Sequence, residues 1–174
     1  MKLNSNLNKL DLTTLCKRCA MVTKTCCRLT DVYLTRGDVH RISAEIQSQN
    51  FFEFRASADP SYMDQEDDPV WGSSVFRPDG SRRVVRHDQE GNCIFLGSEG
   101  CRLSLEIRPL ICRLHPHVYN FKEIYSSISP DCPLTLLGPE ERLEEMIQGF
   151  DQTRAGHWHR MLYDEIAREV AESC

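Results

Sequence analysis

The sequence predicts a small single domain of the α+β class, with cysteine-rich metal-binding loops, short hairpins and C-terminal helices. The chain has 174 residues, enough for one hydrophobic core and too few for two full-sized domains. Helical and hairpin patterns alternate along it, and nine cysteines stand in or near the connecting segments. We expect an N-terminal extension at 1–15, a cysteine-cluster metal-binding domain at 16–137 and a helical segment at 138–174 packed on the same domain.

The composition argues against several function classes. Hydrophobic residues make up 40% and charged residues 27%, and the net charge of −5 gives no global basicity for a nucleic-acid partner. The first residues lack the apolar stretch of about 7–15 residues that a secretory signal needs, and no apolar run approaches bilayer length. We therefore expect a protein of the reducing cytoplasm, without a membrane partner, that meets an unknown protein or small molecule.

The first predicted helix covers about residues 36–48. Thr35 and Asp38 have the spacing of a capping box at its start. Apolar residues then recur on one helical face: Val39, Ile42 and Ile46.

The middle of the chain predicts loops and hairpins. Residues 55–69 carry five acids, one arginine and two prolines, which is typical of an exposed loop. The turn signals PDG and EGN separate short segments within 73–96, which predicts one or two hairpins. Pro109 fits the first turn of a short helix through PLICRL that carries Cys112. An extended segment at 118–125 then leads to the last internal cysteine.

Two C-terminal helices are predicted from EERLEEMIQGF and HWHRMLYDEIAREV, in which apolar residues recur at helical spacing. We place the break between them at Gly156. His157 and His159 turn to different faces of the second helix, so we interpret both as surface residues. His40 and His87 have no partner at metal-ligand spacing.

Nine cysteines in a chain without an export signal are more typical of metal ligands or redox groups than of a disulfide framework. Cys16 and Cys19 have the spacing at which a tight loop turns two thiolates toward one ion, about 2.3 Å from a zinc. Cys26 and Cys27 are adjacent, and neighbouring side chains diverge in an extended chain, which indicates two sites or one ligand beside a bystander. Eight internal cysteines suffice for two four-cysteine sites, or for one site with spare thiols.

Cations gather near the cysteines of this acidic chain. Residues 16–28 contain four cations and no acid, and residues 101–117 contain three arginines and one acid. A group of thiolates around a metal is anionic, so nearby cations would offset its charge and lower thiol pKa values. The alternatives are solvated surface cations and, for Cys93 within CIFL and the terminal Cys174, small buried hydrophobes. We interpret the further basic run at 77–86 as a solvated hairpin face.

Three segments carry a resemblance to a known family: CKRCAMVTKTCCRLTDVYLTRGDVHRI, CIFLGSEGCRLSLEIRPLICRLHP and DCP, spanning residues 16–133. They resemble the successive blocks of the YkgJ family, cysteine-cluster proteins described as a zinc- or iron-chelating domain. The resemblance implies that the metal ligands are the family's cysteine positions: Cys16, Cys19, Cys26, Cys27, Cys93, Cys101, Cys112 and Cys132. It therefore implies metal binding. We expect an iron–sulfur cluster, in the first place 4Fe-4S, or zinc, and the cations near the cysteines make Arg108 and Arg113 candidates to lie beside it.

The resemblance also bears on activity. The family includes the flagellin lysine N-methylases, which are associated with an iron–sulfur cluster, so an oxidoreductase or a methylase-like enzyme is compatible with it, and no catalytic residue is assigned. The chain departs from the family where six residues, AMVTKT, separate Cys19 from Cys26. It departs again where His115-Pro116-His117 replaces the usual aromatic residue before the proline, which makes a histidine there a further candidate ligand.

Three hypotheses stay open at this point. The first is an iron-binding protein, with an iron–sulfur cluster that serves redox chemistry or the modification of a protein or small molecule. The second is a non-catalytic interaction domain stapled by zinc. The third is a thiol–disulfide switch at the vicinal pair without metal, which leaves six internal cysteines unexplained.

Overall fold

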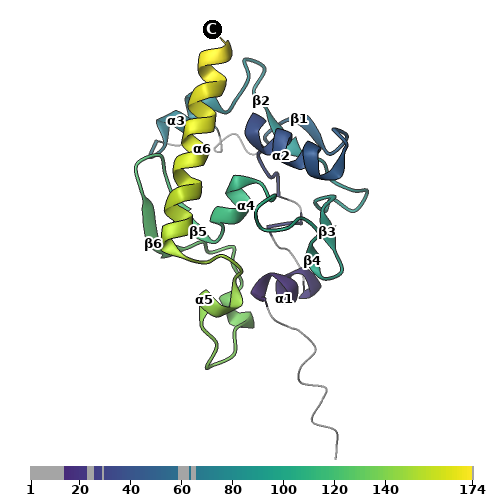
Figure 1. Cartoon of the computed structure of the whole chain (residues 1–174), viewed down its shortest axis with the longest axis vertical. Helices are drawn as coiled ribbons and strands as arrows, with labels where there is room; N and C mark the ends of the chain where they lie inside the picture. The colour runs from purple at the N-terminus through teal and green to yellow at the C-terminus, as the bar shows by residue number, and fades with distance from the viewer. Residues whose placement is uncertain (1–13, 23–25, 29, 59–62, 64–65, 174) are drawn as a thin grey trace, which may run out of the picture.

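The computed structural model describes residues 14–22, 26–28, 30–58, 63 and 66–173. Most of the predicted N-terminal extension, part of the acidic loop, Lys24 and Cys174 lie outside the described residues. The elements follow one another along the chain (Figure 1): α1 Leu15–Val22, α2 Arg36–Ile46, β1 Phe52–Ala56, α3 Pro69–Ser74, β2 Ser81–Val85, β3 Leu96–Gly97, β4 Gly100–Cys101, α4 Leu110–Leu114, β5 His117–Tyr119, β6 Ile124–Ile128, the 3-10 turn η3 Leu134–Leu136, α5 Leu143–Met146 and α6 Gln152–Ser173. Helices together with short antiparallel strand pairs confirm the predicted α+β class.

The strands form three two-stranded antiparallel sheets within the described ranges. β1 pairs with β2, with Phe52 opposite Val85. β2 therefore finds its strand partner on the far side of the acidic segment. Within the predicted region 73–96, an antiparallel bridge joins His87 to Cys93 around the EGN turn, and Ile94 N donates to Arg86 O at 3.1 Å. β3 and β4 form a small hairpin around GSEG. β5 and β6 form a further hairpin over the predicted extended segment.

Local capping explains where two helices begin. At α2, Thr35 Oγ1 accepts a hydrogen bond from Asp38 N at 2.9 Å and Asp38 Oδ2 accepts one from Thr35 N at 3.2 Å, which confirms the predicted capping box. Ile42 on this helix is fully buried. The short helix α3 was not predicted, although Asp68 caps it by accepting from Trp71 N at 3.0 Å.

The C-terminal helices are divided differently from the prediction. α5 is one turn, and α6 runs unbroken for 22 residues, so the predicted break at Gly156 is wrong. The chain turns at Gly149 instead, where φ is 78° and a β-carbon would lie 2.6 Å from a methyl group of Leu105. His159 on α6 is buried rather than on the surface, and its Nε2 lies 2.6 Å from Asn120 O. Tertiary packing of the helix overrides the weak preference of one glycine for a helix end.

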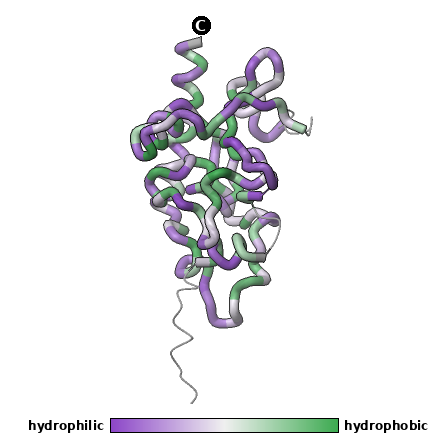
Figure 2. The backbone as a smooth tube through the Cα atoms, turned by 90° about the vertical axis from the view of Figure 1, so that its right-hand side faces the viewer, coloured by the Kyte–Doolittle hydropathy of each residue, from purple (hydrophilic) through white to green (hydrophobic). Residues whose placement is uncertain are grey.

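Three apolar clusters hold the elements together. The first packs α6 against α3 and α4, and its buried members include Trp71, Leu110, Leu114, Trp158, Leu162 and Ile166. The second surrounds α2 and the β1–β2 sheet, and its buried members include Leu34, Ile42, Phe51, Val85, Cys93 and Phe95. The third lies at α1 and α5, with buried Leu15, Cys132, Met146 and Ile147. In Figure 1, α6 runs along one side and α4 lies near the centre, and in Figure 2 hydrophobic and hydrophilic residues alternate along the last turns before the C-terminus.

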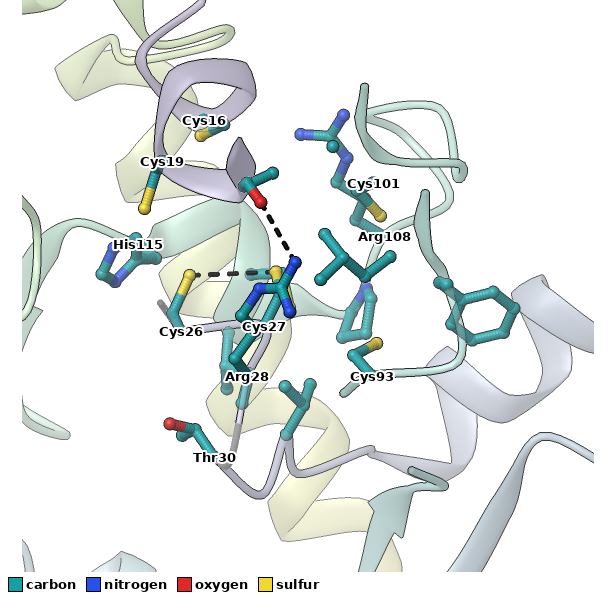
Figure 3. A pocket seen from close by; sticks show the side chains of 18 of the residues that line it. Cys16, Cys19, Cys26, Cys27, Arg28, Thr30, Cys93, Cys101, Arg108 and His115 are labelled. Atoms are coloured by element: carbon teal, nitrogen blue, oxygen red, sulfur yellow. Dashed lines mark hydrogen bonds between the residues drawn. The ribbon is translucent and has the colours of Figure 1, made fainter. Parts of the chain in front are cut away.

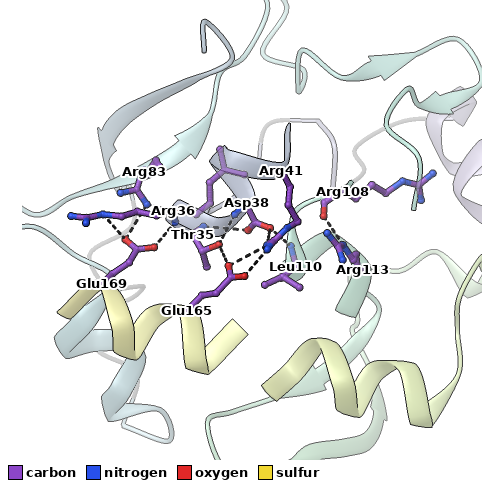
Figure 4. A network of polar contacts seen from close by, with 11 residues as sticks. Thr35, Arg36, Asp38, Arg41, Arg83, Arg108, Leu110, Arg113, Glu165 and Glu169 are labelled. Atoms are coloured by element: carbon purple, nitrogen blue, oxygen red, sulfur yellow. Dashed lines mark hydrogen bonds and ion pairs between the residues drawn. The ribbon is translucent and has the colours of Figure 1, made fainter. Parts of the chain in front are cut away.

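A buried polar network joins α2, α4 and α6 (Figure 4). Arg41 donates to Glu165 Oε1 at 2.6 Å and to Asp38 Oδ1 at 2.7 Å. Thr35 Oγ1 also donates to Glu165, and Asp38 Oδ1 accepts from Leu110 N at 3.1 Å. The network therefore fixes the start of α4, the helix that carries Cys112.

The sequence predicts a solvated hairpin face for the basic run at 77–86, but two of its arginines are not solvated. Arg82 is 2% exposed and lies 3.5 Å from an oxygen of Asp31. Arg83 donates to Leu34 O at 3.0 Å and to Glu169 Oε2 at 3.1 Å. These arginines tie the β1–β2 sheet to its neighbours. In the part of the chain that the structure describes, no helix combines the length and apolar character needed to cross a bilayer.

Candidate metal centre

One cavity of about 680 Å³ is lined by all eight internal cysteines. They come from α1, the turn after it, the loop before β3, β4, α4 and the segment after β6: Cys16, Cys19, Cys26, Cys27, Cys93, Cys101, Cys112 and Cys132. All eight are free thiols, and Figure 3 shows several of them around the cavity. The fold thus brings together every cysteine that the resemblance singled out, including Cys93.

Cys16 and Cys19 lie on a helix and not in the tight loop predicted from their spacing. Residues three apart on a helix share one face, so α1 presents both thiols to the same cavity. Arg18 holds this helix in place, because Nη1 and Nη2 each donate to a carboxylate oxygen of Glu141 at 2.6 Å and Nη1 also donates to Leu136 O at 3.0 Å. Burial raises the pKa of Cys19 to about 11.

The vicinal cysteines differ in their electrostatics. Their Sγ atoms lie 4.0 Å apart. The hydrogen bond from Cys26 lowers the pKa of Cys27; burial opposes this, and the guanidinium groups of Arg108 and Arg28 add to it. The same hydrogen bond, together with burial, raises the pKa of Cys26. Cys27 is therefore the thiol of this pair that ionises first.

Backbone pairing joins the vicinal cysteines to the next two. Cys93 N donates to Cys27 O at 2.8 Å. Leu96 N donates to Cys93 O at 2.8 Å, and Leu96 lies opposite Cys101 in the β3–β4 hairpin. Burial raises the pKa of Cys93 to about 12, so at neutral pH this thiol is protonated unless a metal displaces the proton.

Cys112 and Cys132 line the cavity from two different segments, α4 and the turn after β6. Cys112 lies on α4, where burial and the neighbouring thiols raise its pKa. Cys132 is held by a turn, in which its N–H donates to Ser129 O at 3.0 Å and its carbonyl accepts from Leu134 N at 2.8 Å. Burial raises the pKa of Cys132 to about 11.

Two arginines line the cavity beside the thiols. Arg108 donates from Nε to Leu103 O at 3.0 Å. Burial raises the pKa of Cys101, and the charge of Arg108 and its hydrogen bond to this thiol oppose the rise. Arg28 donates to Asn92 Oδ1 at 2.9 Å and to the carbonyl oxygen of Ala20 in α1 at 3.2 Å. Both arginines have side chains aimed at the region of the thiols in Figure 3.

The other predicted cations lie elsewhere. Arg113 is buried outside the cavity lining, and its Nε donates to Arg108 O at 2.7 Å. It therefore supports the backbone of Arg108 instead of facing the thiols. Lys17 lies 3.8 Å from Glu99.

The two histidines of the His-Pro-His segment have different surroundings. His115 lines the cavity, and burial lowers its pKa, which favours the neutral imidazole that binds metals. His117 is outside the cavity lining and stacks on Phe150 with ring centroids 4.4 Å apart. His87 contacts Arg55 and Thr30 O, both about 3 Å away.

Polar residues that sequence reasoning missed also line the cavity. Thr30, Asp31, Asp131 and Gln148 contribute to its wall. Asp131 directly precedes Cys132, and this neighbouring position is the sequence feature that could have placed Asp131 at the cavity. The others are brought in only by the tertiary fold.

The thiols line the wall of the cavity and do not converge on a single position. Among the described residues, no three side chains of His, Cys, Asp or Glu stand close enough to hold one ion in this arrangement. The chemistry of the donor set nevertheless fits a metal group, because four cysteines are the usual ligands of zinc and of iron–sulfur clusters and eight are present.

Comparison with known proteins agrees with this donor set. The family CxxCxxCC, described as "Putative zinc- or iron-chelating domain", matches residues 15–133. No curated protein and no solved structure matches the chain. The match covers more than half of the 174 residues and contains all eight cavity cysteines. The chain therefore belongs to the CxxCxxCC family of zinc- or iron-chelating domains.

Proposed function

We propose that the cavity thiols bind iron as an iron–sulfur cluster. One observation carries the proposal: all eight thiols line a single cavity of about 680 Å³. A zinc site needs four donors about 2.3 Å from the ion, which uses half of the thiols and little of the space. Iron–sulfur clusters contain several atoms and take four cysteines each, so they match both the number of donors and the volume.

The charges at the cavity support a cluster whose potential is tuned by the protein. A cluster held by thiolates is anionic, and hydrogen bonds and nearby cations stabilise its more negative, reduced state. Arg108 and Arg28 line the cavity, and both lower the pKa of Cys27. Their guanidinium groups therefore favour the thiolate that a metal requires.

The surroundings also support a role in redox chemistry or group modification. A bound cluster would supply one-electron chemistry. Cys16 is exposed, and the cavity has the size of ordinary small-molecule sites, roughly 300–1,000 Å³. His115 and Asp131 line the same space, where they could contact a small molecule or a protein side chain. No residue is assigned a catalytic role.

A zinc-stapled interaction domain is the second candidate, and one observation favours it. α1 packs on β4 and on η3, and cysteines stand on or beside each of these elements: Cys16 and Cys19 on α1, Cys101 on β4 and Cys132 just before η3. A metal between them would join short elements that have little core of their own, which is the usual role of structural zinc.

Anaerobic purification followed by a visible spectrum and analysis for iron, sulfide and zinc separates the two candidates. The proposal predicts a brown protein with broad absorbance near about 400 nm and equal amounts of iron and sulfide. A colourless protein with stoichiometric zinc would overturn it and support the staple. Cys112→Ser is expected to lower the colour and the iron content, whereas Cys174→Ser, outside the family match, keeps both at the wild-type level.

A further inference from the structure

Four of the eight thiols form one compact group. Cys93 is buried in the second apolar cluster, and three further cysteines pack against that cluster: Cys27, Cys101 and Cys112. Backbone hydrogen bonds connect the segments of this group, from Cys93 N to Cys27 O at 2.8 Å and through Leu96 to the strand of Cys101. These four thiols are held together by the core itself.

Electrostatic interactions also connect these four thiols. Burial raises the pKa of Cys112, and Cys27, Cys93 and Cys101 raise it further. Cys27 and Cys101 likewise add to the effect of burial on Cys93, and Cys27 adds to it on Cys101. Every pair among the four is thus close enough for the thiolates to repel each other, which is the arrangement that a shared metal group would relieve.

A second group lies at α1. Cys132 is buried in the third apolar cluster with Leu15, the residue before Cys16. After burial, the next influences that raise the pKa of Cys132 are Cys16 and Cys19, and Cys16 in turn raises that of Cys19. These three thiols are mutual neighbours, and Cys16 is exposed whereas Cys93 is buried.

The remaining thiol, Cys26, lies beside the second group. Side chains of adjacent residues diverge, and Cys27 already belongs to the first group. In Figure 3 the Cys26 side chain lies on the side of Cys19, while Cys93 and Cys101 lie across the cavity. The pKa of Cys26 is raised by Cys27 and Cys112 of the first group as well as by Cys16 of the second, so the position of its side chain is what assigns it.

We propose that the cavity holds two metal centres, an inner one on Cys27, Cys93, Cys101 and Cys112 and an outer one on Cys16, Cys19, Cys26 and Cys132. The vicinal pair is divided between them. This inference rests on the proposed metal binding by the thiols, but it holds for iron–sulfur clusters and for zinc alike. The inner centre is enclosed by the core, and the outer centre, with the exposed Cys16 and with His115 in the same wall, is the one open to exchange or to a substrate.

Metal content of paired cysteine variants tests the division, because losses within one centre are not additive and losses from separate centres are. Cys132→Ser should lose half of the metal of the wild-type protein. The pair Cys26→Ser and Cys132→Ser should lose the same half and no more. The pair Cys27→Ser and Cys132→Ser should lose nearly all of it. Cys174→Ser is the matched control and should keep the full amount.

Several results would overturn the division. It is wrong if the wild-type protein holds one centre, if Cys26→Ser with Cys132→Ser removes all metal, or if Cys27→Ser with Cys132→Ser still retains half. Variants of the buried inner thiols could fail to fold, and in that case the outer variants decide alone. Cys16→Ser, Cys132→Ser and their pair must each retain one intact centre. Their circular dichroism spectra must match that of the wild-type protein.

The same samples distinguish this inference from the proposed function. Two cubane clusters correspond to about eight iron and eight sulfide per chain, four of each per centre. Two zinc ions per chain, lost one at a time in the same variants, would refute the iron–sulfur proposal and support the division. Four iron per chain, lost entirely in every single variant, would refute the division and support the cluster.

Discussion

Cys26 and Cys27 are adjacent in the chain, and their thiol pKa values are shifted in opposite directions. Donation from Cys26 lowers the pKa of Cys27 and raises its own. Arg108 and Arg28 act on Cys27 as further stabilising charges. A metal that enters the cavity would therefore meet one thiol of the pair in a state ready to bind, since the thiolate is the ligand form.

The first prediction concerns the reactivity of Cys27 in metal-free protein. Because its pKa is lowered and those of Cys19 and Cys132 are raised to about 11, Cys27 should be alkylated by iodoacetamide at lower pH than these two. Peptide mapping by mass spectrometry across a pH series measures this. Cys26→Ala should shift the alkylation of Cys27 to higher pH, and Cys26→Ser, which keeps a donor, should shift it less. Earlier alkylation of Cys19 than of Cys27 would contradict the assignment.

At the scale of elements, two contacts place the cysteine-bearing helices. Arg18 clamps α1 to Glu141 and to the carbonyl of Leu136. Asp38 accepts from the first residue of α4 and from Arg41. Each helix is too short to be stable by itself, so its position depends on these tertiary contacts.

The second prediction is a pH-dependent loss of stability on removing the α1 clamp. The hydrogen bonds from Arg18 lower the pKa of Glu141 from an ordinary 4.5 to about 2. A lowered pKa in the folded state stabilises the fold above pH 4.5, and this contribution is lost as the pH falls toward 2. Glu141→Gln should therefore lower the melting temperature modestly at pH 7, and the difference from wild type should vanish near pH 2. Glu140→Gln is the neighbouring control. A difference that is constant with pH would contradict the clamp.

The third prediction concerns the α4 anchor. Asp38→Ala leaves Arg41 with one acidic partner fewer and the Leu110 N–H without its acceptor, so it should reduce the free energy of unfolding by about 3–5 kcal/mol. Urea unfolding of metal-free protein measures it. Asp38→Asn keeps an acceptor oxygen and should lose less. Equal losses in the two variants would show that charge, and not the hydrogen bond to α4, is what matters.

For the whole molecule, all eight thiols line the cavity, and five of them pack in or against the second and third apolar clusters. A metal bound by these thiols as proposed would join segments from residue 16 to residue 132, so its binding free energy would add to folding stability. The fourth prediction is that chelation lowers the melting temperature by about 10 °C or more. Scanning calorimetry before and after metal removal measures this, with Cys174→Ser as control. An unchanged melting temperature would show that the metal does not join these segments.

Local signals explain what could be predicted from the sequence. The capping box of Thr35 and Asp38 is a short-range pattern, and it identified the start of α2. The eight thiols of the cavity were named by the family resemblance, because the cysteine spacings alone left their grouping open. The helical context of Cys16 was missed because CxxC spacing is compatible with a loop and with a helix. Gly156 was misread because packing of α6 outweighs the propensity of one residue.

Long-range contacts explain what could not be predicted. The pairing of β1 with β2 spans the acidic segment, and no local pattern encodes such a register. Arg82 is buried beside Asp31, a partner distant in the sequence. Arg113 contacts the backbone of Arg108 through the local fold of the chain, which a pattern of charges does not show. The division of the thiols into two groups likewise appears only once the apolar clusters are known.

X-ray absorption at the metal edges of anaerobically purified protein decides whether the cavity binds an iron–sulfur cluster, because it reports the element bound and the atoms around it. We expect iron with an all-sulfur shell and neighbouring iron atoms, in wild type and in Cys174→Ser, and loss of that signal when Cys112 and Cys132 are both replaced by serine. Zinc with a single sulfur shell at about 2.3 Å and no neighbouring metal, or a metal bound through nitrogen and oxygen alone, would contradict it.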